Sequence, residues 1–439
     1  MRLGPDTPLP ASVQAPGYDR SAQAAGIVHF GIGAFHRAHQ AVYADDAMNA
    51  GDRDWGIIGV SLRSGDVAAQ LNPQDGVYTV STRSAAGTDL RLIGAVQRVL
   101  VAAENPQAVI DAIAAPTTHI VSFTVTEKGY LRGPGGALDL VAAKEPSSLY
   151  RFVGAGLAAR HAAGLPGLTL LSCDNLAGNG AVLKTSMRQY LAAAHPEVGD
   201  WFDTECRCPA TMIDRIVPAT TEADRAAIET ELGARDQGAV VTEAFSQWVI
   251  EDDFAGPRPR WEKVGAQLVA DVAPYETAKL RMLNGAHSAL AYIGLGRGHE
   301  YVHQAVADPD IRSVIERLMR HEAAPTIAAA PGQDLSAYAD ALLDRFANPA
   351  LDHRLIQIAM DGSQKIPQRW LKTLAWHQAR GARCASLEAA VVAWIVFLRS
   401  DHPIDDPLAD RLREAAAAQD AIERLLGDGG LIASDWRPA

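Results

Sequence analysis

The fold of this chain is decided by the stretch Gly26-Ile27-Val28-His29-Phe30-Gly31-Ile32-Gly33. Residues 26–30 predict a short buried strand, and a helical stretch at Ala38–Ala50 follows the two glycines. A strand, a Gly-x-Gly turn and a helix in this order begin a dinucleotide-binding fingerprint. Glycine is needed because the turn is tight and the backbone must approach the pyrophosphate closely. The N–H groups at the start of the helix would then face the phosphates.

The fingerprint is incomplete, because His36 stands where its third glycine would fall. Two glycines alone fit a plain turn about as well as a cofactor loop, and the strand before them favours the loop. We therefore predict that the cofactor is bound by residues of the turn and of the start of the helix, namely Gly31, Ile32, Gly33, Ala34, Phe35 and Arg37.

Selection of the cofactor depends on the residues after the second predicted strand, Trp55–Val60. Asp66 is the nearest carboxylate after this strand. A carboxylate beside the adenosine ribose would repel a 2′-phosphate, which favours NAD. Arg63 would instead attract that phosphate, so NADP stays open as the alternative.

The segments farther along the first half alternate between strands and helices. Strands are predicted at Arg91–Val96, His119–Val125 and Leu168–Ser172, and helices lie between them, as at Pro106–Ala114 and Tyr150–Ala163. Such alternation predicts a parallel sheet with helices on both faces.

The pattern changes after Pro274, where convincing strands disappear. Helices are predicted at Glu276–Leu295, Asp310–Ala323, Leu335–Phe346, Leu387–Leu398 and Ala409–Leu426. We therefore expect an α/β protein with a Rossmann-like, doubly wound N-terminal domain over residues 1–270. A mostly α-helical C-terminal domain would occupy residues 271–439. Substrate sites are common in the cleft between two such domains.

Charge and composition narrow the class of partner to small molecules. The formal net charge of −12 argues against non-specific binding to nucleic acid and against docking on anionic membranes. Met1–Gln14 shows no signal peptide, so we expect a cytoplasmic protein. The four cysteines form no CxxC pair, and Cys206-x-Cys208 is too isolated to define a zinc site. No metal site is predicted.

The most informative stretch for chemistry lies at the start of the second half. On one helix, Glu276, Lys279, Asn284 and His287 could face a common cleft. A buried Lys can exchange the proton of an alcohol as hydride moves, and amide donors can hold the alkoxide oxygen. A carboxylate next to the Lys could pass the proton to solvent. From the residue spacing alone, a solvent-exposed helix face with a Glu–Lys ion pair fits this stretch slightly better than an active site does.

Two polar loops come directly after predicted strands, where a doubly wound sheet binds its ligands. Leu171–Gly180 contains Asp174 and Asn175, and Thr124–Tyr130 contains Glu127. The acid and amide of the first loop could equally be plain turn formers.

Five motifs together resemble the polyol-specific long-chain dehydrogenases, the mannitol dehydrogenase family. They keep the family's order and span most of the chain, from about residue 27 to about residue 370. The motifs are Phe30–Gln40, Ser172-Cys173-Asp174-Asn175, Asp214-Arg215-Ile216, Lys279-x4-Asn284-x2-His287 and Met360–Lys365.

The resemblance implies a metal-independent mechanism with NAD in a protein that is a monomer or a weak homo-oligomer. Lys279 would be the general acid–base, and Asn175 and Asn284 would form the oxyanion hole. His287 would orient the substrate, and Glu276 would relay the proton. The remaining implied contacts to substrate come from Asp214, Lys365 and the active-site loop at Glu127. His36 at the third fingerprint position is normal in this family.

The substrate branch is indicated by the run His353–Arg369, which is most similar to fructuronate reductases. Gln357 stands where the mannitol branch tends to carry Arg. Arg281 could bind a substrate carboxylate through a bidentate pair. Arg281 is, however, two residues from Lys279 and should point away from it, so a structural ion pair fits at least as well.

These patterns support three functions to different degrees. The resemblance favours reversible reduction of D-fructuronate by NADH to D-mannonate. The alternative within the same chemistry is a polyol dehydrogenase acting on mannitol or arabinitol. A silent NAD-binding sensor would be expected to lack Lys279 or one of the oxyanion-hole amides, and all of them are present.

Overall fold

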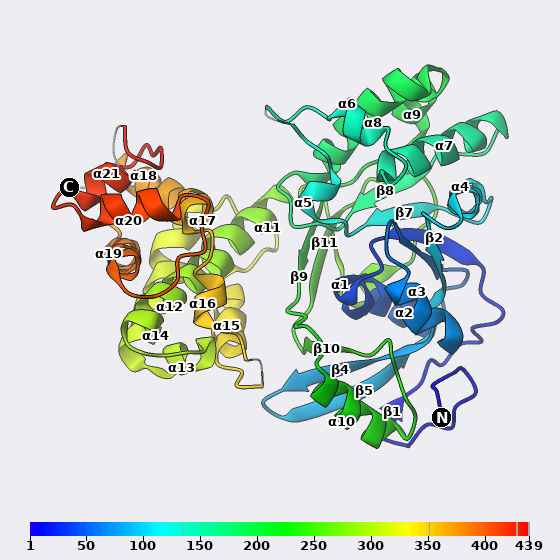
Figure 1. The fold of residues 1–439 in the computed structure, drawn as a ribbon, viewed down its shortest axis with the longest axis horizontal. Coiled ribbons are helices and arrows are strands. Elements are labelled where there is room, and N and C mark those ends of the chain that lie inside the picture. The colour runs from blue at the N-terminus through cyan, green and yellow to red at the C-terminus, as the bar shows by residue number, and fades with distance from the viewer. Residues whose placement is uncertain (134, 351, 427–428, 438–439) are drawn as a thin grey trace. The chain divides into compact units, whose positions relative to one another are not determined.

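The computed structural model describes residues 1–133, 135–350, 352–426 and 429–437. The chain forms two compact units, Met1–Val272 and Ala273–Ala439 (Figure 1). The last two residues of the predicted second domain, 438–439, lie outside the described residues. Within the described part of the chain, no helix combines the length and the apolar character needed to cross a bilayer.

The first unit is built on a five-stranded parallel sheet in the order β6-β3-β2-β7-β8. The central strand β2 pairs in register with its neighbours, so that His29 lies opposite Gly59 on one side and Ser122 on the other. The chain runs outward from β2 in one direction and returns at β7, so the strand order reverses between them. Ligands bind at such a switch point. The strands are β2 (Ala25–Phe30), β3 (Gly56–Ser61), β6 (Val96–Val101), β7 (Ile120–Phe123) and β8 (Thr169–Ser172).

Both faces of this sheet are covered, as the near-continuous apolar strands predict. Successive side chains of β2 enter different cores, because Ile27 belongs to one cluster and Val28 to the other. The first cluster contains residues of α2 (Gln40–Asn49), and the second contains residues of α4 (Pro106–Ala114) and α7 (Leu149–Ala162). The predicted Rossmann-like, doubly wound architecture is confirmed.

Two smaller sheets complete the first unit. Their strand orders are β1-β5-β4-β10 and β12-β11-β9. The predicted strand Arg91–Val96 is wrong: it joins the end of one strand to the start of the next across Gly94 and Ala95. Apolar residues continue through this turn and hide the break. The strands are β1 (Val13–Gln14), β4 (Tyr78–Ser84), β5 (Gly87–Ile93), β9 (Thr211–Asp214), β10 (Val240–Glu243), β11 (Gln247–Glu251) and β12 (Gln267–Val269).

The remaining helices of the first unit connect these strands or cover the sheets. They are α1 (Ala34–Ala38), α3 (Asp66–Leu71), α5 (Thr126–Gly129), α6 (Leu140–Ala143), α8 (Asn179–Ala194), α9 (Gly199–Glu205) and α10 (Glu222–Leu232), with 3-10 turns η1 (Asn72–Gln74), η2 (Pro196–Val198) and η3 (Trp261–Val264).

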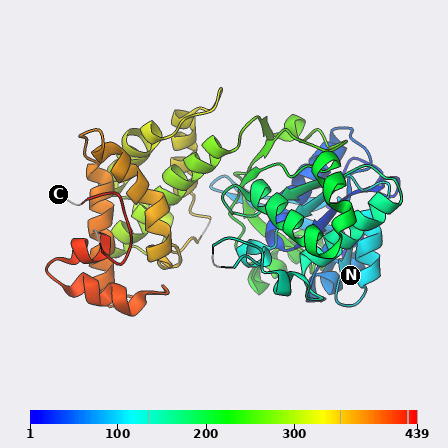
Figure 2. The same cartoon turned by 90° about the horizontal axis from the view of Figure 1, so that it is seen from above.

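The second unit is mostly α-helical in its described residues, as predicted, and its regular elements there are all helices (Figure 2). Its central helix is α12 (Gly285–Gly296), which is buried on most sides and packs against α13, α16 and α19. The helices around it are α11 (Ala273–Ala278), α13 (Val302–Ala307), α14 (Pro309–Arg317), α15 (Leu335–Phe346), α16 (Leu355–Ile358), α17 (Gly362–Ile366), α18 (Lys372–Gln378), α19 (Ala385–Arg399), α20 (Ala409–Ala417) and α21 (Ala421–Leu426).

Among the described residues of the second unit, three segments are π-helical rather than α-helical. They are η4 (Lys279–Asn284), η5 (Leu318–Ala323) and η7 (Pro367–Leu371). The predicted helix Glu276–Leu295 therefore consists of α11, η4 and α12 in succession. A 3-10 turn, η6 (Ala324–Thr326), comes directly after η5. Single π turns within α-helices occur frequently at functional sites.

Candidate active site

Gly31 and Gly33, the two fingerprint glycines, are required for different reasons. Gly31 has φ +95°, and a Cβ on it would lie 2.0 Å from the carbonyl oxygen of Thr124. Gly31 is therefore enclosed between β2 and the end of β7. Gly33 has an ordinary φ of −75°, and the nearest atom to an added Cβ would be 3.9 Å away. Space beside Gly33 is what a closely approaching phosphate group needs.

His36, at the third fingerprint position, fills space that a glycine would leave empty. Its ring stacks on His29 with the centroids 3.4 Å apart. The rings are buried, and His29 contacts the hydroxyls of Ser122 and Thr124 at 2.8 Å each. Burial lowers the pKa of His29 to about 3, and burial followed by the neighbouring His29 lowers the pKa of His36 well below its usual value. The stack is therefore neutral near pH 7.

The other predicted cofactor residues divide between the protein interior and the loop surface. Ile32 is buried and fills the space beside Gly59. The Arg37 guanidinium donates to the Gly238 carbonyl and lies 5.7 Å from the ring centre of Tyr78. Ala34 and Phe35 are partly exposed at the start of α1. The contacts of Arg37 with the protein indicate a structural role for its side chain.

Asp66 begins α3, shortly after the carboxyl end of β3. Its carboxylate is exposed and accepts a hydrogen bond of 2.5 Å from the Ser64 hydroxyl. The neighbouring Arg63 is also exposed. Because ligands bind at the carboxyl ends of parallel strands, Asp66 lies at the edge where an adenosine ribose would be held.

Asp174 joins the two predicted active-site loops of the first unit. Its buried carboxylate accepts hydrogen bonds from the backbone N–H groups of Val125 and Thr126, at 3.1 and 2.8 Å. It also accepts one of 2.9 Å from the Tyr130 hydroxyl. The pKa of this carboxyl group is raised, because the effect of burial is larger than the opposing effect of the three donors. Asp174 therefore fixes the loop after β7 to the end of β8.

The predicted site residues on these loops are exposed beside this clamp. Asn175 comes directly after Asp174, and Glu127 lies on the short helix α5. Asn179 is buried and bonds the Thr211 backbone in both directions, with its amide donating at 2.9 Å and its oxygen accepting at 3.0 Å. This pair fixes the loop to β9, which ends at the buried, predicted substrate residue Asp214.

The catalytic residues predicted on the second unit lie around the π turn η4. Glu276 lies on α11, three residues before Lys279, and Lys279 and Asn284 are the first and last residues of η4. In an α-helix, five residues turn by about 500°, which would leave these two side chains about 140° apart. A π-helix bonds residue i to residue i+5, so it returns Asn284 toward the side of Lys279. The five-residue spacing of Lys279 and Asn284 is therefore suited to this turn.

His287 lies one turn farther along, in the first turn of α12, and is 8% exposed. Its ring contacts Phe346 and His353, with centroid distances of 4.7 and 5.2 Å. Burial, then the neighbouring His353, Arg345 and Arg369, lower the pKa of His287 well below its usual value. His287 is therefore a neutral imidazole near pH 7, able to donate or accept a hydrogen bond without carrying charge.

The predicted substrate residues of the second unit have different surroundings. Arg281 donates to the carbonyl and the hydroxyl of Thr326, at 2.8 and 2.6 Å, which is a structural contact. Gln357 is exposed on α16. Lys365 donates to the Met360 carbonyl at 2.6 Å and lies 3.9 Å from the Asp361 carboxylate. Burial, and then Arg369, lower the pKa of Lys365.

A family model described as the mannitol dehydrogenase Rossmann domain matches residues 25–263. The model of the mannitol dehydrogenase C-terminal domain matches residues 271–431. The chain belongs to the mannitol dehydrogenase family.

Relatives within the mannitol dehydrogenase family differ in their named substrates. An uncharacterized oxidoreductase of Escherichia coli, YeiQ, is 42% identical over 95% of this chain and 89% of its own length. The E. coli D-mannonate oxidoreductase is 40% identical, covering 98% and 93%. Among solved structures, Pseudomonas fluorescens mannitol 2-dehydrogenase, in a ternary complex with NAD and D-mannitol, is 37% identical with a TM-score of 0.82, covering 96% and 90%. This mannitol dehydrogenase family member is therefore an oxidoreductase.

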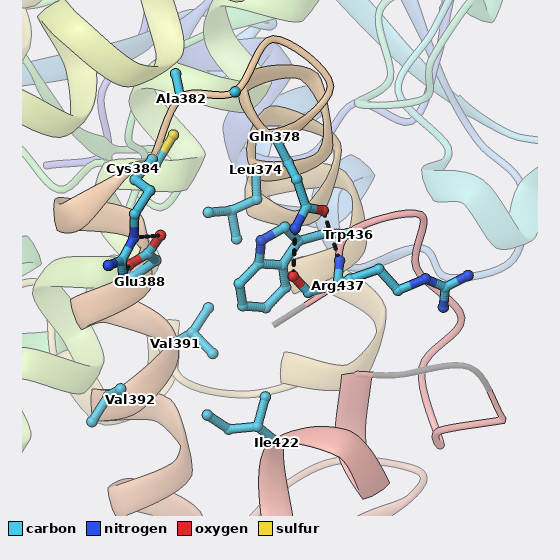
Figure 3. A pocket seen from close by; sticks show the side chains of 12 residues that line it. Leu374, Gln378, Ala382, Cys384, Glu388, Val391, Val392, Ile422, Trp436 and Arg437 are labelled. Carbon is cyan, nitrogen blue, oxygen red and sulfur yellow. Dashed lines mark hydrogen bonds and ion pairs between the residues drawn. The ribbon is translucent and has the colours of Figure 1, made fainter. Parts of the chain in front are cut away.

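No three His, Cys, Asp or Glu side chains are grouped as metal ligands among the residues that the structure describes. A cavity of about 370 Å³ does open in the second unit, around α18, α19 and the C-terminal segment (Figure 3). Gln378 borders it and exchanges two hydrogen bonds, of 2.6 and 2.9 Å, with the backbone of Arg437. None of the predicted site residues of this mannitol dehydrogenase family member lines the cavity.

Three residues that contact the predicted site residues or their neighbours were not themselves predicted as site residues: Asp174, Arg369 and Trp370. Asp174 stood in a quoted motif, but an Asp after a strand is equally typical of a turn. Arg369 and Trp370 contact the backbone at Asn284 and Gly285, which are 85 residues away in sequence. Sequence spacing carries no signal for such a contact.

Proposed function

We propose that this oxidoreductase reduces a keto sugar acid, D-fructuronate, to D-mannonate with NADH, and catalyses the reverse reaction. The support from similarity is the D-mannonate oxidoreductase relative, at 40% identity over nearly the whole chain. The observation that carries the chemistry is the π turn with Lys279 and Asn284 at its two ends, together with a neutral, buried His287 after it.

The first unit has a place that fits NAD. The space beside Gly33, which a Cβ would enter, lies at the switch point of the parallel sheet. The backbone of Gly31–Gly33 and the start of α1 would hold the pyrophosphate, and Asp66 would hold the ribose. When bound, the reduced nicotinamide supplies hydride to the substrate's keto carbon.

The protein's own residues protonate the oxygen of that carbon and stabilise the charge that develops on it. Lys279, as the ammonium ion, donates its proton to the oxygen as negative charge develops there. The Asn284 amide donates a hydrogen bond to this oxygen, and Asn175 on the first unit is the second amide predicted for this role. His287, held neutral, orients the substrate by a hydrogen bond and does not compete for the transferred proton. Glu276 returns a proton from solvent to Lys279.

The choice of an acid substrate rests on the charge around Lys365. Its ammonium is partly buried, and Arg369, four residues along, is a second cation beside it. Asp361, Asp405 and Asp406 partly offset this effect, yet the pKa of Lys365 stays below its usual value. A substrate carboxylate near Lys365 would restore the stability of its charged form. A neutral polyol would not.

A polyol dehydrogenase acting on mannitol or arabinitol is the second candidate. The observation that favours it is the similarity to the P. fluorescens mannitol 2-dehydrogenase structure, with a TM-score of 0.82. The contact of Arg281 with Thr326 also removes one reason to expect a carboxylate at that residue.

The test compares NADH oxidation with D-fructuronate, D-tagaturonate and D-fructose at equal concentrations. We expect the highest kcat/KM with D-fructuronate, and a preference for D-fructose would establish the polyol alternative instead. Lys279→Ala should lower kcat by roughly 10²–10⁴-fold with little change in NADH affinity. A Lys279→Ala enzyme that keeps more than about a tenth of the turnover would rule out Lys279 as the acid–base.

A further inference from the structure

The π-helical segment η4 packs against both other π-helical segments, η5 and η7, and its contact with η7 carries side-chain donors. This contact is made by polar donors on η7 and backbone carbonyls at the end of η4. The Trp370 indole N–H donates to the Gly285 carbonyl at 3.0 Å, and this side chain is fully buried. Arg369 donates to the Asn284 carbonyl at 3.2 Å and to the Ser288 hydroxyl at 2.7 Å.

These contacts reach the place where the wide π turn passes back into α-helix. A π turn inserts an extra residue and shifts the carbonyls at its end relative to the regular α-helical ladder. The two carbonyls belong to the N-cap residue and the first residue of α12, so the donors from η7 hold the start of α12 from outside the helix. The approach is close, because an added Cβ on Gly285 would lie 3.4 Å from the Arg369 carbonyl oxygen.

The turn matters because of the residue at its end. Without the π turn, the Asn284 and Lys279 side chains would lie about 140° apart around the helix. The proposed oxyanion hole needs this amide within hydrogen-bond reach of the reacting oxygen. A small displacement of such a group can cost as much as about 10²-fold in rate.

We propose that Arg369 and Trp370 are positioning residues that hold the turn Lys279–Asn284 in its π form and so place the Asn284 amide for the reaction. This inference rests on the proposed function, because it assigns Asn284 a role in hydride transfer. Neither residue needs to touch the substrate to act in this way.

Trp370 gives the cleaner test of the two, because Arg369 also carries charge. Burial lowers the pKa of Arg369 to about 10, so it remains a cation at neutral pH and contributes to keeping His287 neutral. Trp370→Phe removes the N–H donor and keeps an aromatic ring in the core. We expect a 10- to 100-fold fall in kcat, with unchanged NADH affinity and a larger primary isotope effect with deuterated NADH.

A double-mutant cycle shows whether Trp370 acts through Asn284. In an Asn284→Ala background, Trp370→Phe should lower kcat by less than about twofold further. Trp376→Phe is the matched control, since this half-exposed indole on α18 stacks on Arg380, and its activity should equal that of the wild type.

Two results would overturn the proposal: wild-type kcat and isotope effect in Trp370→Phe, or full additivity with Asn284→Ala. If Trp370→Phe does not fold, Arg369→Lys replaces it in the same double-mutant cycle. This substitution keeps the positive charge but removes the guanidinium that donates to Asn284 and Ser288. Failure of the proposed function itself looks different, because Asn284→Ala and Lys279→Ala would then both keep their activity on every substrate tested.

Discussion

At the scale of single residues, the two fingerprint glycines are needed for opposite reasons: protein atoms crowd Gly31, whereas the space beside Gly33 is open. Gly31→Ala should destabilise the protein before any ligand binds, because its Cβ would lie 2.0 Å from the Thr124 carbonyl oxygen at φ +95°. The expected loss is at least about 2 kcal/mol of unfolding free energy. Urea denaturation without cofactor measures it.

Gly33→Ala is the matched control, because nothing lies within 3.9 Å of its added Cβ and its φ of −75° suits any residue. Its unfolding free energy should equal that of the wild type. NADH affinity should nevertheless fall at least tenfold in fluorescence titration, because the methyl group would occupy space meant for the pyrophosphate. Unchanged NADH binding in Gly33→Ala would show that the cofactor lies elsewhere.

Among the structural elements, the ends of β7 and β8 depend on one carboxylate. Asp174→Asn replaces an acceptor of three hydrogen bonds with an amide whose nitrogen would face N–H donors. We expect a loss of about 1–3 kcal/mol in stability. Activity should fall about 10- to 100-fold, because Asn175 and Glu127 leave their positions. Thermal denaturation and kcat measure the two effects.

Asp253→Asn is the matched control for this variant. Its carboxylate is exposed and pairs with Arg207 at 3.2 Å, so removing its charge should leave both stability and kcat near wild-type values. Wild-type turnover in Asp174→Asn would show that the clamp does not position the two loops.

Elements differ in how far they can be predicted from sequence. The strand β2 is predictable because its apolar run is short and ends at Gly31. The strands around Gly94 are not, because apolar residues continue through the turn between β5 and β6. The π turn η4 is hidden for a related reason. Glu276–Leu295 has the apolar pattern of an ordinary helix, and the residues of η7 that contact the end of the turn lie 85 positions away in sequence.

At the scale of the whole molecule, buried histidines connect stability to pH in both units. His29 and His36 lie in the first unit, His287 lies in the second, and burial is the largest cause of the lowered pKa in all three. Below pH of about 6.5 these side chains take up protons in the unfolded chain but stay neutral in the native one. The unfolded state then binds more protons, so native stability falls as pH falls.

Each such histidine contributes a loss of up to about 1.4 kcal/mol per pH unit below its unfolded pKa. For the two in the first unit, acidification from pH 7 to about 5.5 should therefore remove about 2–3 kcal/mol. Asp45 and Asp174, whose pKa burial raises, act in the opposite direction at lower pH, which makes the range above about pH 5 the informative one. Urea denaturation at several pH values gives the slope.

His36→Phe keeps an aromatic ring in the stack with His29 while removing one titrating group. Between pH 5 and 6.5, the slope of the unfolding free energy against pH should therefore decrease by the contribution of about one bound proton. His161→Gln, at an exposed histidine on α7, should leave the slope as it is in the wild type. A stability that stays constant from pH 7 to 5.5 would mean that protons reach the His29–His36 stack in the native state. That result would contradict the neutral state of His29 and His36. It would leave the roles proposed for Lys279 and the π turn in the second unit unaffected.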